Sequence, residues 1–290
     1  MSTPAMDNRD GSIWFDGKLI PWREARVHML THALHYGSAV FEGEQVYGGK
    51  VFKLTQHSQR LLDSGRLLGF DIPYNVGELD AATQEVLVAN HIGSGYVRPL
   101  AWRGSEKISV SAPESSIHVA IAAWDTLPPY SDEARMQGIR MCTSKWVRPA
   151  PNVAPFAAKA SGLYVTSTLA KHAAEAAGFD DALMLDYRGQ LAEATLANIF
   201  LVMDGELHTP LPDCFLNGIT RQTVIELAQD AGIRVVERAI LPGELGQASE
   251  VFVTGTAAEI QPVREIDDYR FSAGTTTRNI MAAFDTLVGR

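Results

Sequence analysis

Hydrophobic positions along the chain predict short antiparallel strands joined by tight turns. Apolar runs flank Asp16-Gly17 in "SIWFDGKLIPW" and Gly48-Gly49 in "AVFEGEQVYGGKVFKL". Two-residue turns of this composition between apolar runs are the strongest short-range signal of a β-hairpin. A third hairpin is predicted in "ANIFLVMDGELHTP", with its turn at Asp204-Gly205. The chain therefore uses antiparallel pairing in both of its halves.

Helical periodicity lies between the strands. Over residues 55–70, Thr55 stands in a capping position, and one buried face is formed by Leu61, Leu62, Leu68 and Phe70. Four more helices are predicted over residues 76–91, 164–178, 221–232 and 277–288. Further strands are predicted over residues 96–102, 116–124, 139–147, 234–240 and 250–255. Because hairpins dominate over βαβ alternation, the predicted class is α+β.

The apolar pattern breaks near "DTLPPYSDEARMQG", where prolines and charges replace it. Such a stretch is typical of an exposed connection between domains. We predict an N-terminal domain over residues 1–126, a linker over 127–135 and a C-terminal domain over 136–290. A chain of 290 residues with 46% hydrophobic content is large enough to fill two cores.

Composition narrows the classes of partner and compartment. A net charge of -9 leaves no basic surface for nucleic acid or anionic lipid. Cys142 and Cys214 are too few for a disulfide framework, and neither has metal-like Cys/His spacing around it. The start, "MSTPAMDNRDGS", shows no signal-peptide pattern, and no apolar run is long enough to cross a bilayer. We expect a cytoplasmic protein with reduced thiols and no metal.

A lysine in "PFAAKASGLY" stands among small apolar residues. Lys159 is flanked by Ala158 and Ala160 and precedes Tyr164 by five residues. A surface lysine that extends its ammonium group to water explains most lysines of this kind. Alternatively, partial desolvation lowers the pKa of the amine and frees its lone pair for a Schiff base. The local pattern leaves both interpretations open.

Two stretches carry backbone groups suited to an anion. In "NGITRQTVIEL" a helix is predicted to begin, and in "TGTAAEI" a turn follows a strand. Free N–H groups at a helix start or in such a turn favour a phosphate or a carboxylate. The residues concerned are Gly218, Ile219, Thr220, Thr256, Ala257 and Ala258. Each stretch alone is equally consistent with an ordinary capped helix and an ordinary turn.

Two charged side chains add to this set. Arg60 lies on the polar side of the helix predicted over residues 55–70, where its guanidinium group could bind a phosphate in a forked geometry or remain a solvated charge. Glu193 is flanked by Ala192 and Ala194, and a carboxylate in such apolar surroundings usually needs a cationic partner. A protonated ring nitrogen would be one such partner.

Seven stretches together resemble the branched-chain aminotransferase family, fold type IV of the pyridoxal-phosphate enzymes. They are "HALHYGSAVFEG", "HSQRLLDS", "YVRPL", "AAKASGLY", "LAEATLANIF", "NGITRQTVIEL" and "VFVTGTAAEIQPV", in the order of the family. Seven ordered motifs are far more specific than any single one. The resemblance implies a smaller N-terminal α/β sandwich domain, a larger C-terminal mixed barrel-like domain, pyridoxal 5'-phosphate as cofactor, and at least a homodimer.

The resemblance also implies roles for the cofactor-binding residues. Lys159 matches the Schiff-base lysine, which also moves the substrate proton. Glu193 matches the carboxylate that keeps the pyridine nitrogen protonated, and Tyr164 matches the phenol that binds the cofactor O3'. The phosphate site corresponds to Arg60, Gly218, Ile219, Thr220 and Thr256.

For the substrate, Tyr96, Ala257 and Ala258 match the side that binds the carboxylate. Tyr36 and Phe41 match the walls of the side-chain pocket, and Arg98 stands behind Tyr96. One departure concerns Gln45 in "FEGEQVY", because many relatives carry an arginine at that position. A neutral amide there removes a cation that an acidic co-substrate would use, unless Arg98 compensates.

These residues predict a transaminase that moves the amino group of a branched-chain or other hydrophobic L-amino acid to a 2-oxo acid such as 2-oxoglutarate. The alternative within the fold is an (R)-amine or D-amino-acid transaminase, and an aminodeoxychorismate-type lyase is less consistent with "YVRPL". A non-catalytic binding protein of the same fold is a further alternative. The intact set of lysine, glutamate and phosphate-site residues argues against it.

Overall fold

The computed structural model describes residues 5–126 and 132–290. Residues 127–131, where the predicted linker begins, lie outside the described residues. The chain forms two compact units, unit 1 with Met1–Leu127 and Ala158–Gly162, and unit 2 with Pro128–Ala157 and Leu163–Arg290. The segment Ala158–Gly162 therefore packs with the N-terminal half, although it follows the predicted boundary by more than twenty residues.

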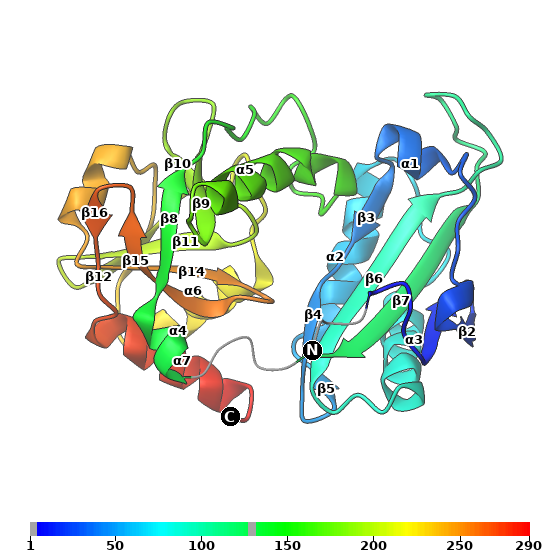
Figure 1. Cartoon of the computed structure of the whole chain (residues 1–290), viewed down its shortest axis with the longest axis horizontal. Coiled ribbons are helices and arrows are strands. Elements are labelled where there is room, and N and C mark those ends of the chain that lie inside the picture. The colour runs from blue at the N-terminus through cyan, green and yellow to red at the C-terminus, as the bar shows by residue number, and fades with distance from the viewer. Residues whose placement is uncertain (1–4, 127–131) are drawn as a thin grey trace. The chain divides into compact units, whose positions relative to one another are not determined.

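Unit 1 is built on a seven-stranded sheet with the order β2-β1-β7-β6-β4-β5, and β3 pairs with β6 (Figure 1). Its strands are β1 (Ser12–Phe15), β2 (Lys18–Pro21), β3 (Ala39–Phe41), β4 (Glu44–Tyr47), β5 (Lys50–Val51), β6 (Gly95–Arg103) and β7 (Ile117–Asp125). Its helices are η1 (Trp22–Glu24), α1 (His32–Tyr36), α2 (Leu54–Leu67) and α3 (Val76–Ala89). Both α2 and α3 pack on the sheet.

The two faces of the unit 1 sheet differ in burial. Along β4, Glu44 and Val46 are buried, while Gln45 and Tyr47 are half-buried. Strand β6 begins with the same alternation. Because successive side chains of a strand point to opposite faces, one face packs against helices and the other is left for the half-buried side chains.

The predicted hairpins are confirmed. Both central residues of each turn have positive φ, as in Asp16 and Gly17 (47° and 93°) and in Asp204 and Gly205 (51° and 79°). Such values are typical of the type I′ turn that matches strand twist. The predicted cap at Thr55 is wrong, because α2 begins at Leu54 after Lys53, whose φ is 51°. The Thr55 hydroxyl instead donates a hydrogen bond to Asp80.

Unit 2 contains nine strands, six of which close into a barrel. The chain of pairings β10-β9-β8-β15-β14-β11 returns to β10 through the pair of Glu193 and Asn198, which confirms the predicted barrel-like fold. The strands are β8 (Ile139–Thr143), β9 (Asp181–Leu185), β10 (Leu191–Ala194), β11 (Asn198–Met203), β12 (Glu206–Thr209), β13 (Val235–Glu237), β14 (Glu250–Gly255), β15 (Glu259–Ile266) and β16 (Tyr269–Arg270). Most neighbours are antiparallel, and β8 pairs in parallel with both β9 and β15.

Helices surround the barrel in Figure 1. They are α4 (Asp132–Gln137), α5 (Val165–Ala176), α6 (Ile219–Asp230), η3 (Pro242–Gln247) and α7 (Thr275–Leu287). The short helix η2 (Ser161–Tyr164) begins in unit 1 and ends in unit 2. Helix α5 packs on β9, while α6 and α7 pack on each other and on β14. Side chains such as Met141, Leu183, Ile199 and Val253 form the buried core. In the described part of the chain no helix combines the length and apolarity that a bilayer-spanning segment requires.

Candidate active site

Lys159 is fixed to unit 1 through its backbone. Its N–H donates to the Ser64 hydroxyl of α2 at 3.0 Å, and its carbonyl accepts from the Phe41 N–H at 3.0 Å. The next residue, Ala160, forms an isolated bridge with Val40. The lysine segment thus extends the edge of β3, which explains why it packs with the N-terminal half.

The side chains around Lys159 come from the half-buried face of the unit 1 sheet. The Lys159 Nζ lies 4.9 Å from the centroid of the Phe41 ring, and the Arg98 guanidinium group lies 4.8 Å from the same centroid. Arg98 Nη2 donates to the Tyr96 hydroxyl at 3.3 Å, and Gln45 pairs with Tyr96 across β4 and β6. Phe41, Arg98 and Tyr96 are therefore linked by contacts to one another beside Lys159, and Gln45 pairs with Tyr96 on the neighbouring strand.

Two nearby positions complete this face. Gly43 has no room for a side chain, because an added Cβ would lie 1.9 Å from the Tyr96 hydroxyl oxygen. Tyr36, predicted as a pocket wall, lies on α1 and is 46% exposed. Its ring packs against His32 at a centroid distance of 4.7 Å.

Arg60 is not the solvated helix charge that its local pattern allows. Its Nε and Nη2 donate to the two carboxylate oxygens of Glu42 at 2.6 and 2.7 Å. His57 Nδ1 lies 2.7 Å from Glu42 Oε2, and since a carboxylate only accepts, the histidine donates. Local sequence reasoning missed Glu42 and His57, although both lie inside motifs of the resemblance. The two hydrogen bonds to Glu42 fix the orientation of the Arg60 guanidinium group, and His57 in turn holds Glu42.

The pKa values of Glu42 and His57 indicate which groups of this cluster carry a charge. Burial by itself raises the pKa of Glu42, but the ion pair and hydrogen bonds with Arg60 and the hydrogen bond from His57 outweigh it, so this pKa lies far below its usual value. Burial lowers the pKa of His57 more than the hydrogen bond to Glu42 raises it. Glu42 and Arg60 are therefore charged at neutral pH, whereas His57 is neutral.

Glu44 is a second buried carboxyl group behind the same sheet. It is 1% exposed, and neither of its carboxyl oxygens has a hydrogen-bond partner. Burial, and secondarily the negative charges of Glu42 and Asp80, raises the pKa of Glu44 well above its usual value. Uncompensated burial of a carboxylate is unfavourable, so Glu44 tends to remain protonated in the folded protein.

Glu44→Gln is expected to reduce the loss of stability with rising pH. A raised folded-state pKa means that the folded state binds the proton more tightly than the unfolded state. Stability therefore falls as pH rises from the unfolded pKa of Glu44 to its folded pKa, by up to about 1.4 kcal/mol per pH unit. Thermal unfolding of both proteins from pH 4 to pH 9 measures this difference. Parallel curves for the two proteins would exclude a titrating Glu44.

In unit 2, Glu193 has the cationic partner that its apolar neighbours require. It is 8% exposed on β10, and its Oε1 lies 2.9 Å from Nε of Arg148, which is 6% exposed. Arg148 Nη2 also donates to the Ser167 hydroxyl at 2.9 Å. The sequence analysis predicted that Glu193 needs a cationic partner but did not identify Arg148, because forty-four residues lie between Arg148 and Glu193 in the chain. A charged Glu193 carboxylate is thus stabilised within the barrel unit.

The start of α6 lies next to the same strand pair. Asn198 Nδ2 lies 3.4 Å from Glu193 Oε2, and Asn198 Oδ1 accepts from the Gly218 N–H at 3.2 Å. No side chain caps α6, whose first residues Ile219 and Thr220 are both buried. An uncapped helix start has N–H groups that can bind an anion.

The other predicted anion-binding backbone lies in the hairpin of β14 and β15. Residues Thr256, Ala257 and Ala258 form its three-residue turn between paired Gly255 and Glu259. On β14, Thr254 Oγ1 is buried and has no hydrogen-bond partner. Thr254 of β14 pairs with Asn198 of β11, and the Asn198 side chain accepts a hydrogen bond from Gly218 at the start of α6. Asn198 therefore links the strand before the turn to the start of α6.

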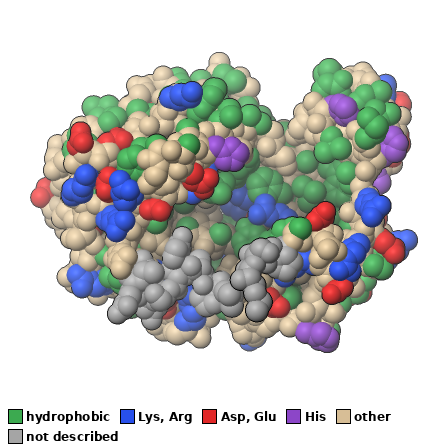
Figure 2. Space-filling view, in the orientation of Figure 1, with side chains coloured by type: hydrophobic (Ala, Val, Ile, Leu, Met, Phe, Trp, Pro, Cys, Tyr) green, Lys and Arg blue, Asp and Glu red, His purple; other side chains and the backbone are tan. Residues whose placement is uncertain are grey.

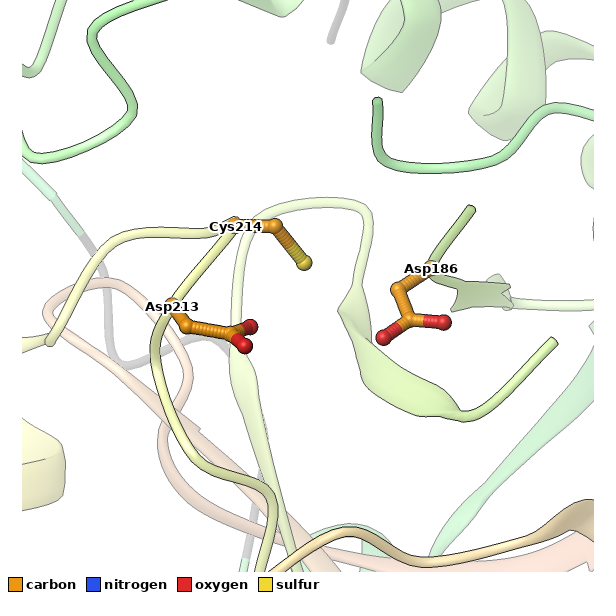
Figure 3. Close-up of side chains that lie close together, drawn as sticks. All are labelled: Asp186, Asp213 and Cys214. Atoms are coloured by element: carbon orange, nitrogen blue, oxygen red, sulfur yellow. The ribbon is translucent and has the colours of Figure 1, made fainter. Parts of the chain in front are cut away.

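One group of acidic and sulfur side chains also converges in unit 2, as Figure 3 shows for Asp186, Asp213 and Cys214. The two carboxylates already share Arg188, whose Nη2 lies 2.6 Å from Asp186 and 2.9 Å from Asp213. Burial, with a smaller effect of Asp213, raises the pKa of the Cys214 thiol to about 12. A neutral thiol and an arginine between the carboxylates do not make a cation site.

The predicted site residues therefore divide into two sets, one in each unit. Unit 1 contains Tyr36, Phe41, Gln45, Arg60, Tyr96, Arg98 and Lys159. Unit 2 contains Tyr164, Glu193, Gly218, Ile219, Thr220, Thr256, Ala257 and Ala258. The first set offers an amine, aromatic rings and cations, and the second offers a paired carboxylate and anion-binding backbone.

Comparison with known proteins gives a consistent result. The family model of the amino-transferase class IV matches residues 39–266. The branched-chain-amino-acid aminotransferase of Pseudomonas aeruginosa is 41% identical over 99% of this chain and 96% of that protein. The enzyme of the same name from Escherichia coli (strain K12) is 40% identical over 94% of this chain and 91% of its own length.

Solved structures agree with the sequence relatives. The crystal structure of the Escherichia coli branched-chain amino acid aminotransferase matches with a TM-score of 0.93 and 39% identity, covering 97% of this chain and 95% of that one. The branched-chain amino acid aminotransferase from Thermobaculum terrenum in its PLP-form matches with a TM-score of 0.87 and 32% identity, over 96% and 93% of the two chains. The chain therefore belongs to the class IV aminotransferase family and is an aminotransferase of fold type IV.

Proposed function

We propose that the enzyme uses pyridoxal 5'-phosphate to transfer the amino group of a branched-chain or other hydrophobic L-amino acid to a 2-oxo acid such as 2-oxoglutarate. The observation that carries the proposal is Lys159, whose backbone is hydrogen-bonded on both sides and whose amine lies against Phe41. The names of the relatives support the choice of substrate class.

The described residues fit this cofactor. Its phosphate suits the uncapped start of α6, and the adjacent strand β14 offers one more polar atom, the buried Thr254 Oγ1, which has no hydrogen-bond partner. Its ring nitrogen suits Glu193, a buried carboxyl group whose Oε1 lies 2.9 Å from Arg148 Nε. When bound, the cofactor supplies an aldehyde carbon and a ring that accepts the electrons left after a proton leaves the substrate Cα.

In the proposed mechanism, each side chain has one task. The Lys159 amine would hold the cofactor covalently and, when free, would act as base and then as acid, moving the proton from the substrate Cα to the cofactor C4′. Glu193 keeps the ring nitrogen protonated, and Tyr164 donates a hydrogen bond to the ring oxygen. Arg60, oriented by Glu42, and the backbone of Ile219, Thr220 and Thr256 bind phosphate oxygens.

The substrate side is proposed on the same basis. Tyr96 and the N–H groups of Ala257 and Ala258 bind the carboxylate, while Phe41 and Tyr36 contact an aliphatic side chain. A pocket of this kind discriminates between side chains by only about 1–3 kcal/mol per methylene. We therefore expect overlapping activity toward several hydrophobic amino acids.

A donor panel tests the proposal. The enzyme is assayed with hydrophobic L-amino acids, their D-enantiomers and both enantiomers of a simple aryl amine, each with several 2-oxo acids. The proposal expects the L-amino acids to be the best donors. A preference for D-amino acids or an (R)-amine would assign the alternative specificity. A protein with bound cofactor and no turnover of any donor would instead be a binding protein.

Gln45→Arg is expected to improve use of 2-oxoglutarate about tenfold relative to pyruvate. Gln45 pairs with Tyr96 and lies on the half-buried face of the sheet. Glu44 lies on the other face, so a new arginine at position 45 would not form an ion pair with it. A charge-assisted hydrogen bond contributes about 1.5–3 kcal/mol, of which the new side chain's ordering offsets part.

The measurement is the ratio of kcat/KM for 2-oxoglutarate to that for pyruvate in both proteins. Arg98→Gln is the matched comparison, because Arg98 already places a cation beside Tyr96. An unchanged ratio in Gln45→Arg with a lowered ratio in Arg98→Gln would assign recognition of the acidic substrate to Arg98.

A homodimer and a cytoplasmic location are part of the proposal. Around α1 in unit 1, Met29, Leu34 and Val110 are 63–79% exposed, and Figure 2 shows hydrophobic side chains gathered over this end. His32 Nε2 lies 2.8 Å from the Ser109 carbonyl oxygen, so the two contributing segments form one surface. A second copy is its proposed occupant, because the surface continues to Tyr36 of the substrate pocket. Sedimentation as a monomer only would exclude the dimer.

A further inference from the structure

The turn that carries Thr256, Ala257 and Ala258 ends in an unusual backbone conformation. Glu259, the first residue of β15, has a φ of 52° and is 6% exposed. Residues other than glycine seldom adopt this left-handed region, and they remain there only where surrounding contacts hold them. The direction of the N–H groups in the turn therefore depends on what holds Glu259.

Two arginines hold the Glu259 side chain. Arg290 Nη2 donates to Glu259 Oε2 at 2.7 Å, and Arg135 Nη2 lies 3.6 Å from the same oxygen. Asp285 of α7 accepts from Arg290 Nη2 at 2.6 Å and from Arg135 Nη1 at 3.1 Å. Two cations and two anions thus form one network that joins α4 and α7 to the end of the turn.

Packing gives the turn little support on one side. A cavity of about 450 Å³ borders Ala257, Ala258 and Glu259, and Arg135 and Arg290 line it as well. Among the described residues, no side chain packs against the turn where the cavity borders it, so shape complementarity fixes the position of the turn only in part. Charge-assisted hydrogen bonds on the rim of the cavity must then hold the backbone in place.

We propose that Glu259, held by Arg290 and Arg135, is a positioning residue that orients the turn and thereby sets the affinity for the substrate carboxylate. This inference rests on the proposed function, in which the N–H groups of Ala257 and Ala258 bind that carboxylate. The carboxylate does not change during the reaction, so its contacts contribute to substrate binding more than to the chemical step. Loss of the network raises KM and leaves kcat nearly unchanged.

The test uses the holoenzyme with three variants. Arg290→Met removes the charge at similar length, and Arg290→Lys keeps a charge but lacks the guanidinium geometry in which Nη2 donates to both carboxylates. Arg234→Met is the control, because Arg234 forms an ion pair of the same length, 2.7 Å, with Glu206 on β12 of the same unit, at a more exposed position than the pair of Arg290 and Glu259. Should Arg290→Met fail to fold, Glu259→Gln makes the same comparison. Each protein is measured by steady-state kinetics and by hydrogen–deuterium exchange over residues 254–261.

For Arg290→Met we expect KM for the amino acid and for the 2-oxo acid to rise about tenfold with kcat within about twofold, and exchange over the turn to become faster. Arg290→Lys should lie between this variant and the wild type, and Arg234→Met should match the wild type. Unchanged KM, with or without faster exchange, would overturn the inference. A fall in kcat and Tm at constant KM would also overturn it. Failure of the proposed function shows separately, as a wild-type enzyme that turns over no amino acid.

Discussion

Lys159→Ala is expected to reduce transamination by at least about a thousandfold. Under the proposed mechanism the variant loses both the amine that attaches the cofactor and the group that moves the proton at the substrate Cα, and a positioned general base alone contributes about 10²–10⁴-fold. The fold should survive, because the backbone of residue 159 makes the hydrogen bonds to Ser64 and Phe41. Any remaining cofactor would bind without a covalent bond.

Attachment is measured separately from activity. After borohydride reduction, the intact mass of the wild type should increase by one cofactor, and that of Lys159→Ala should not. Lys171→Ala is the matched control, since Lys171 lies on α5 and its Nζ donates to the Asp180 carbonyl oxygen. Normal turnover by Lys159→Ala, or cofactor mass retained after reduction, would refute the assignment.

Glu193→Gln is expected to lower kcat about a hundredfold and to destabilise unit 2. The amide cannot stabilise a protonated ring nitrogen, so proton removal from the substrate slows while the cofactor remains bound. It also leaves Arg148 buried without a counter-charge, and removing one partner of a buried ion pair costs about 3–5 kcal/mol.

A double variant separates these two effects. Glu193→Gln with Arg148→Gln removes both charges, so stability should recover while kcat remains low. Thermal unfolding and single-turnover kinetics of both single variants and the double variant provide the cycle. Recovery of kcat together with stability would show that Glu193 acts only through the fold.

Local sequence chemistry was sufficient for most of the fold. Turns at Asp16-Gly17 and Asp204-Gly205 need positive φ at both central residues, and few residue pairs other than these satisfy that need. The apolar spacing of α2 was read correctly for Leu61 and Leu62, which are buried, but Leu68 and Phe70 lie beyond the end of the helix at Leu67. The start of the same helix was predicted wrongly, because the Thr55 hydroxyl donates a hydrogen bond to Asp80 on α3 and does not cap α2.

For the candidate site as well, some residues were predicted from the sequence and others were seen only in the structure. Lys159, Glu193 and the backbone at Ile219 and Thr256 were predicted as site residues because each lies in a motif of the family resemblance, whereas the local pattern alone left their roles open. Their partners were not found by local reasoning. Arg148 precedes Glu193 by a barrel strand and a helix, and Glu42 reaches Arg60 from a different element of unit 1.

Residues close together in the chain were enough to predict the hairpins, most of the helices and each of the seven motifs whose order indicates the family. The surroundings and pairing of the chemical groups followed only from contacts between distant parts of the folded chain. The tertiary structure paired Glu193 with Arg148, buried Glu44 without a partner, and joined the segment Ala158–Gly162 to the N-terminal unit. Ion pairing and desolvation act through space, so the order of residues does not reveal which distant side chains will share a buried environment.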